Sequence, residues 1–161
     1  MLKRFLMVFA VASVAVVGCK KENEVAPVTT PTGAVAADKV RLIVTVPTST
    51  KDTDKLTLAG SFPNESWDPK KSAKYELKRN TATEYTIDLA ISDLPKSGDL
   101  EYKVVKNVTA TDNSDGWKFV EKTIDCKELA TNRTVTTPAT QGGKSIKITV
   151  DAFRNTGTCG D

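Results

Sequence analysis

The chain has 161 residues, with 23 basic and 20 acidic side chains and no histidine. Two basic residues, Lys3 and Arg4, fall in an N-terminal leader, which leaves 21 basic against 20 acidic residues. This balance argues against a nucleic-acid partner, because phosphate binding requires a clear basic excess. The lack of histidine excludes the common Ser/His and Cys/His nucleophiles. With no Cys-x-x-Cys spacing either, we expect no metal and no cofactor.

The N-terminus has the pattern of an export signal. Two basic residues precede the apolar stretch Phe5–Val17, which is too short to span a bilayer comfortably as a helix. It ends in Val16-Val17-Gly18-Cys19, which resembles the lipobox of bacterial lipoproteins. That resemblance implies that residues 1–18 are a signal peptide and that Cys19 carries lipid. The alternatives are an ordinary secretory signal or a short anchor helix.

Residues 19–38 predict a flexible tether behind the lipidated cysteine. The segment is charged at first and then rich in Pro, Thr, Ala and Val without a period, so it cannot bury enough apolar surface to fold alone. Lys21–Glu24 loosely resembles a motif that sorts some lipoproteins to the cell surface; the alternative is a solvated spacer. We therefore expect a membrane-anchored lipoprotein of the outer membrane, with the cell surface as a further location.

Residues 39–161 predict one all-β domain. Short segments with β-branched enrichment or period-2 alternation recur between turn signals, and no helical period competes with them. The predicted strands are Val40–Val46, Lys55–Ala59, Ala73–Leu77, Glu84–Ile91, Leu100–Val105, Trp117–Val120, Arg133–Thr137 and Ser145–Asp151. Seven to eight such strands predict an immunoglobulin-like antiparallel β-sandwich, and their half-polar pattern is typical of sheets with one solvated face.

Two cysteines remain once Cys19 is assigned to lipid. Cys126 and Cys159 form an even pair in an exported chain, where disulfides persist. We predict that they are bonded, which ties the segment before the last strands to the C-terminus. Two free thiols are the alternative.

Three side chains carry the candidate chemistry. Trp67 lies in the turn-rich stretch Leu58–Pro69, and Trp117 follows the turn signal Asp115-Gly116. In the strand Leu100–Val105, Leu100, Tyr102 and Val104 share the core face, so Lys103 points the opposite way. An indole face stacks on the C–H face of a pyranose ring, and a lysine ammonium can donate to sugar hydroxyls. Two tryptophans set at an angle suit the turn of a helical α-glucan.

The same residues resemble a known family. In order they are Leu58-Ala-Gly-Ser-Phe62, Trp67-Asp-Pro-Lys70, Tyr75-Glu-Leu77, Glu84-Tyr-Thr-Ile-Asp-Leu89, Leu100-Glu-Tyr-Lys-Val104, Trp117 and Thr131-Asn-Arg133. They are similar to the starch-binding domain, which is carbohydrate-binding module family 20, and to the glycogen-binding modules of family 48. The resemblance covers about Val40 to Val150 and implies a β-sandwich that binds α-glucan without cleaving it.

The resemblance also implies a set of site residues. The positions that match the main glucan site of the family are Trp67, Lys103, Trp117 and Asn132. Four features depart from the family pattern. The loop Asn107–Gly116 is polar and somewhat long. Lys118 stands where an acidic residue is more usual, the stretch Thr123–Ala130 looks inserted before Asn132, and the family's second glucan site has no clear equivalent.

We therefore predict a non-catalytic binder of starch- or glycogen-like α-glucan, held at a membrane by a lipid anchor near glycan hydrolases or importers. No pair of carboxylates suitable for glycoside hydrolysis can be chosen from the scattered Asp and Glu residues. Two alternatives remain open. One is an immunoglobulin-like protein-interaction or structural lipoprotein without a sugar site, and the other is a binder of a different polysaccharide.

Overall fold

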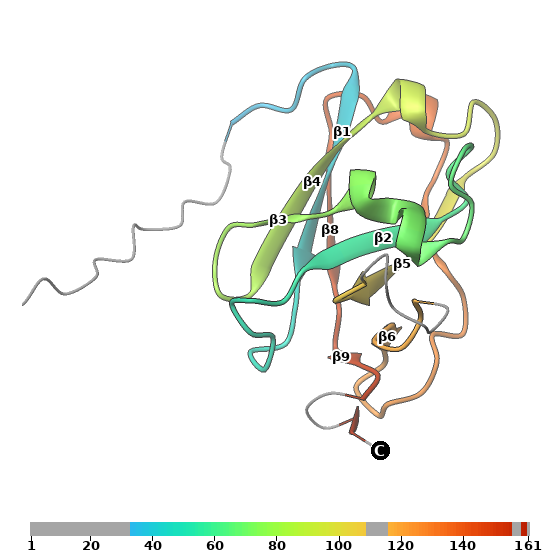
Figure 1. The fold of residues 1–161 in the computed structure, drawn as a ribbon. Helices are drawn as coiled ribbons and strands as arrows, with labels where there is room; N and C mark the ends of the chain where they lie inside the picture. The colour runs from blue at the N-terminus through green and yellow to red at the C-terminus, as the bar shows by residue number, and fades with distance from the viewer. Residues whose placement is uncertain (1–32, 109–115, 156–158, 161) are drawn as a thin grey trace, which may run out of the picture.

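The computed structural model describes residues 33–108, 116–155 and 159–160. The predicted signal peptide, Cys19 and most of the predicted tether lie outside these residues. Among these residues, nine strands and three short 3-10 segments follow one another (Figure 1). They are β1 (Lys39–Thr45), β2 (Leu56–Gly60), η1 (Pro69–Tyr75), β3 (Lys78–Arg79), β4 (Glu84–Ala90), η2 (Ile91–Asp93), β5 (Leu100–Lys106), β6 (Glu121–Lys122), β7 (Arg133–Val135), η3 (Pro138–Thr140), β8 (Ser145–Thr149) and β9 (Ala152–Phe153). No helix among the described residues is long and apolar enough to cross a membrane.

Two sheets enclose the core. One has the order β3-β4-β1-β8 and the other β2-β5-β7, while β6 and β9 pair separately. The core takes alternate residues from both larger sheets, such as Leu42 of β1, Leu58 of β2 and Tyr102 of β5, each with no exposed surface. This inward alternation is what the period-2 pattern predicted. The predicted immunoglobulin-like β-sandwich is confirmed.

Two details of the sheets differ from the prediction. The strands number nine rather than seven to eight, because β3, β6 and β9 are two-residue strands with no local pattern of their own. The sheet is also not wholly antiparallel: β1 pairs in parallel with β8, with Leu42 opposite Ile146 and Val44 opposite Ile148. The other strand pairs are antiparallel.

Two predicted strands are wrong. Ala73–Leu77 does not form a strand, because the chain from Pro69 to Tyr75 coils into η1. Asp68 accepts a hydrogen bond from the Lys70 N–H at 3.0 Å, and Pro69 occupies the first position, so capping starts a helical turn here. The second, Trp117–Val120, is a turn in which the Val120 N–H donates to the Trp117 carbonyl at 3.3 Å. The strand β6 begins after it.

The predicted disulfide is present. Cys126 and Cys159 are bonded, with Cα atoms 5.3 Å apart and a sequence separation of 33. The bond joins the loop after β6 to the segment after β9. Because β6 and β9 already pair through Glu121 opposite Phe153, the cross-link closes a compact corner of the domain.

Candidate functional site

Trp67 stands on the loop that follows β2. Its backbone has φ of 54°, a left-handed conformation that large side chains seldom adopt. Its N–H donates to the Gly60 carbonyl at 2.7 Å, which folds the loop back onto the end of β2. The indole is half-buried and not enclosed between the sheets. The local structure therefore presents this ring at the surface.

Gly60 makes that loop possible. A Cβ at this position would lie 2.2 Å from the Glu101 carbonyl oxygen and 2.9 Å from Tyr102 Cα, both backbone atoms of β5. Only glycine lets β2 approach β5 so closely where the Trp67 loop begins.

We expect Gly60→Ala to lower the free energy of unfolding by about 2–3 kcal/mol, because backbone atoms cannot move aside as a side chain can. Urea unfolding followed by far-UV circular dichroism measures the change. Gly33→Ala is a useful comparison, because a Cβ at Gly33 would meet nothing within 4 Å. Equal losses in the two variants would show that overlap with β5 is not what matters at Gly60.

Trp117 arrives on a second loop that contacts the first. Gly116 before it has φ of 86°, and a Cβ there would lie 3.0 Å from Pro69 Cβ. The ring packs against a small apolar cluster formed by Ala59, Val105 and Val120. The indole therefore packs on this cluster, and the Trp117 side chain is half-buried.

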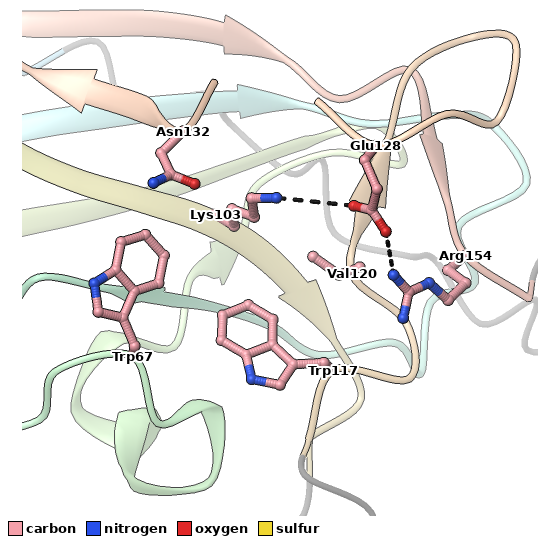
Figure 2. Close-up of a pocket in the computed structure, with 7 residues that line it drawn as sticks. All are labelled: Trp67, Lys103, Trp117, Val120, Glu128, Asn132 and Arg154. Carbon is pink, nitrogen blue, oxygen red and sulfur yellow. Dashed lines mark hydrogen bonds and ion pairs between the residues drawn. The ribbon is translucent and has the colours of Figure 1, made fainter. Parts of the chain in front are cut away.

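The two indoles form a bent surface. The ring centroids of Trp67 and Trp117 are 6.3 Å apart and the ring planes are inclined by 33° (Figure 2). The spacing and tilt suit neighbouring sugar rings of a curved chain, since each aromatic face can stack on one pyranose face.

Lys103 and Asn132 lie beside the rings. Lys103 is on β5 opposite Ala59 and turns away from the core, as the strand phase predicted. Asn132 precedes β7, and its side-chain N–H donates to Glu101 Oε2 at 2.9 Å. The ion-pair partner that the structure gives Lys103 is Glu128.

All four predicted site residues line one pocket of about 410 Å³. Its lining consists of Trp67, Lys103, Trp117, Val120, Glu128, Asn132 and Arg154. Figure 2 shows the two rings on one side, with Lys103 and Asn132 on the other. The structure thus brings together residues from four separate stretches of the chain.

Sequence reasoning missed three lining residues: Val120, Glu128 and Arg154. Val120 was read as part of a strand, and Arg154 carries no local motif. A signal for Glu128 did exist, because the stretch Thr123–Ala130 stood out as an insertion in the family pattern. The insertion was not recognised as a source of site residues.

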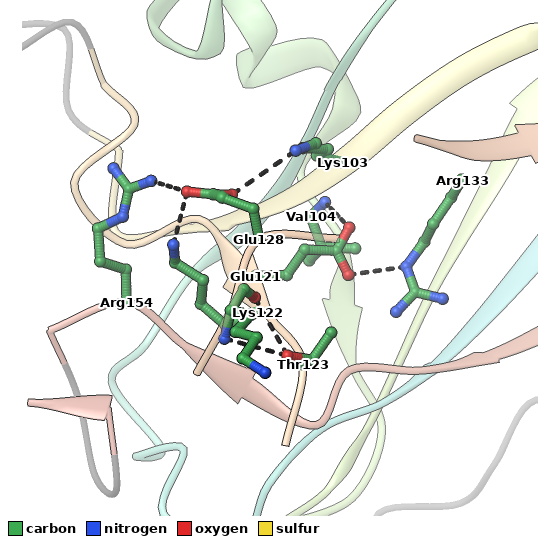
Figure 3. A network of polar contacts seen from close by, with 9 residues as sticks. Lys103, Val104, Glu121, Lys122, Thr123, Glu128, Arg133 and Arg154 are labelled. Atoms are coloured by element: carbon green, nitrogen blue, oxygen red, sulfur yellow. Dashed lines mark hydrogen bonds and ion pairs between the residues drawn. The ribbon is translucent and has the colours of Figure 1, made fainter. Parts of the chain in front are cut away.

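Glu128 contacts three cationic side chains at the pocket (Figure 3). Its Oε1 accepts from Lys122 Nζ at 2.5 Å and also from the Arg154 guanidinium, while its Oε2 lies 3.8 Å from Lys103 Nζ. The hydrogen bond from Lys122 lowers the pKa of Glu128, partly offset by burial, and Arg154 acts in the same direction as Lys122. The carboxylate therefore stays ionised below the usual range of a glutamate.

A second carboxylate lies close to Lys103 but does not line the pocket. Glu121 is fully buried, accepts from the Val104 N–H at 2.8 Å and is ion-paired with Arg133 Nε at 2.7 Å. Burial raises its pKa, and Arg133 opposes that effect. Burial likewise raises the pKa of neighbouring Tyr102 to about 12. Glu121 has no exposed surface, so it is closed to a ligand.

The arrangement can stack on a ring and hydrogen-bond the polar groups around it. Two aromatic faces, an ammonium, an amide and one carboxylate line the pocket, and these groups supply stacking surface, donors and acceptors. Glycoside hydrolysis needs two carboxyl groups flanking the bond to be cleaved. Of the two carboxylates here, only Glu128 is among the lining residues of this pocket.

Comparison with known proteins gives one match in sequence. No family model matches the chain. A segment of an amylopullulanase from Thermoanaerobacterium thermosulfurigenes is 33% identical over 115 residues, or 71% of this chain. The chain spans 5% of the length of that relative.

Two solved structures are also similar. One is a glycoside hydrolase family 15 glucoamylase from Hypocrea jecorina, with a TM-score of 0.45 and 16% identity, covering 77% of this chain and 19% of that one. The other is the family 20 carbohydrate-binding module of a maltotetraose-forming amylase from Pseudomonas saccharophila, with a TM-score of 0.43 and 14% identity, covering 68% of this chain and 99% of that one. By its motifs the chain resembles the family 20 starch-binding domain, and by overall sequence it is similar to a segment of an amylopullulanase.

Proposed function

We propose that this chain is a non-catalytic module that binds α-glucan, of the starch or glycogen type. The observation that carries the proposal is the pair of half-buried indoles, 6.3 Å apart and inclined by 33°, with Lys103 and Asn132 facing them across one pocket. A flat β-glucan would suit a coplanar row of rings better. The likeness to an amylopullulanase segment supports the same class of ligand.

The proposal includes a lipid anchor on Cys19. It rests on the lipobox-like sequence and on the polar, proline-containing residues that follow. An anchored binder with one weak site gains from effective concentration when several copies meet one polymer. Such a protein would hold glucan near the membrane for hydrolases or importers. Incorporation of labelled palmitate into the wild type, and its loss in Cys19→Ser, is the expected result.

Affinity electrophoresis tests the ligand class. The full chain, kept in solution by a detergent without a sugar headgroup, is expected to be retarded in a gel that contains amylopectin. Maltoheptaose is expected to change its tryptophan fluorescence, and a β-linked glucan of equal length is not. Unretarded migration together with an unchanged spectrum would remove the α-glucan assignment. A response to the β-linked control alone would point to a different polysaccharide.

A further inference from the structure

The loop between β6 and β7 contributes a charged residue to the pocket. Glu128 on this loop faces Lys103 of β5, Lys122 of β6 and Arg154 just after β9 (Figure 3). Three cations from three separate segments thus converge on one carboxylate. The neighbouring charges on the loop itself, Asp125 and Lys127, pair with each other at 3.0 Å.

This convergence decides where the Lys103 ammonium lies. A lysine side chain has a flexible four-carbon stem, and without a fixed partner its head moves into solvent. Here the Lys103 side chain is 18% exposed, and its Nζ is 3.8 Å from Glu128 Oε2. At that distance the contact is an ion pair rather than a hydrogen bond, so it leaves the ammonium N–H groups to donate to a ligand.

Removing the carboxylate would leave like charges facing one another. Lys122 Nζ and the Arg154 guanidinium both bond the same oxygen of Glu128, and Lys103 lies at the other oxygen. Like charges in a partly desolvated site repel more strongly than they do in water. Lys103, on the pocket side, is then expected to swing away from the tryptophans.

The disulfide lies close to Glu128 in the sequence. Cys126 is two residues before Glu128, in a turn closed by hydrogen bonds from the Cys126 N–H to the Thr123 carbonyl and from the Thr123 N–H to the Lys127 carbonyl. Its partner Cys159 accepts a backbone hydrogen bond from Asn155, the residue after Arg154. One cross-link therefore fixes both the acid and one of its cations.

We propose that Glu128 is a positioning residue of the glucan site, that it holds the Lys103 ammonium beside the two indoles, and that the Cys126–Cys159 disulfide keeps it there. The inference rests on the proposed function, since it concerns how the same pocket grips its sugar. In this view the apparent insertion is part of the binding site and does more than close the domain.

Affinity for maltoheptaose, measured by fluorescence titration of the full chain, tests the role of Glu128. Glu128→Gln is expected to weaken binding roughly tenfold, which is the scale of losing one charged hydrogen bond from Lys103 to the sugar. Asp125→Asn, which removes the same charge from the same loop outside the pocket, is expected to stay within about twofold. Glu128→Asp keeps the charge and is expected to recover part of the loss.

A double-mutant cycle separates positioning from general support of the fold. If Glu128 acts through Lys103, Glu128→Gln adds little to the loss already caused by Lys103→Met. A purely structural role gives the same loss in both backgrounds. Near-UV circular dichroism confirms that each variant is folded, and Glu128→Asp serves in the same cycle if Glu128→Gln does not fold.

The pH profile gives an independent readout. Because the pKa of Glu128 is lowered, its contribution is present at neutral pH and is lost as the pH falls below the usual range of a glutamate. Wild-type affinity is expected to fall in that acid range, and the ratio of wild type to Glu128→Gln is expected to approach one. The other carboxylates titrate in both proteins, so the ratio isolates Glu128.

The disulfide is tested by replacing both cysteines with serine, Cys126→Ser with Cys159→Ser. Binding is expected to weaken severalfold in the wild-type background and much less in the Glu128→Gln background. If Glu128→Gln binds as tightly as the wild type while the double variant Trp67→Ala with Trp117→Ala binds nothing, the inference is overturned and the proposed function stands. If the wild type binds no glucan, both fail together.

Discussion

Replacing both tryptophans, Trp67→Ala with Trp117→Ala, is expected to abolish binding of maltoheptaose. Buried aromatic anchors at binding sites typically contribute at least about 2 kcal/mol each, so losing two corresponds to roughly a thousandfold in affinity. The two rings supply the stacking faces of the pocket, and the polar groups around them compete with water for the same sugar hydroxyls. Isothermal titration calorimetry with maltoheptaose measures the loss of affinity. This method does not depend on indole fluorescence, which the double variant lacks.

The single variants are expected to differ. Trp67 sits on a loop, so Trp67→Ala should weaken binding with little effect on stability. Trp117 also packs on Ala59, Val105 and Val120, so Trp117→Ala should lower stability as well by about 1–3 kcal/mol. Phe119→Ala is the matched control, because Phe119 lies two positions beyond Trp117 and is absent from the pocket lining. Full affinity in a folded double tryptophan variant would refute the role given to the rings.

Truncating the buried acid, Glu121→Ala, is expected to lower the free energy of unfolding by about 3–5 kcal/mol. Glu121 has no exposed surface, and its carboxylate accepts from the Val104 N–H and is paired with Arg133. Alanine would leave a buried donor without an acceptor, a guanidinium without its counter-charge and a cavity in place of the carboxyl group. Urea unfolding at neutral pH, followed by circular dichroism, measures the change.

Two controls make this prediction specific. Glu76→Ala breaks an exposed pair with Lys55 at 3.2 Å, and is expected to cost less than about 1 kcal/mol. Glu121→Gln keeps an oxygen for the Val104 N–H and is expected to cost less than alanine. Burial raises the pKa of Glu121 above that of a glutamate in the unfolded chain. The wild type therefore loses stability relative to Glu121→Gln as the pH rises from the unfolded pKa through the raised folded pKa. A Glu121→Ala variant as stable as Glu76→Ala would show that the buried pair adds nothing.

Much of the scaffold was predictable because it depends on local pattern. Alternation in Leu100–Val105 placed Leu100, Tyr102 and Val104 in the core and Lys103 outside it, as the structure has them. The pattern in Ala73–Leu77 misled, because Tyr75 and Leu77 are buried although most of the segment coils. The cap formed by Asp68 and the proline after it favoured a helical turn over the strand that the alternation predicted. Both residues can be recognised in the sequence.

The candidate site was predictable only in part. Trp67, Lys103, Trp117 and Asn132 could be chosen from motifs whose order in the chain matched a family, and the structure gathers them at one pocket. Glu128 and Arg154 could not be chosen in that way. Their place depends on the pairing of β6 with β9 and on the disulfide, which bring distant segments together.

The amino-acid sequence by itself determined the alternating strands, the cysteine pair available for a disulfide, and the turn-forming residues that lift Trp67 and Trp117 out of the strands. These properties follow from side-chain period and backbone preference over a few residues. Only the tertiary structure decided that β8 runs parallel to β1, that the two indoles meet at 33°, and that three cations share Glu128. Such relations depend on which strands become neighbours in the sheets. Burial of the whole core selects the order of the strands, and no local sequence pattern specifies it.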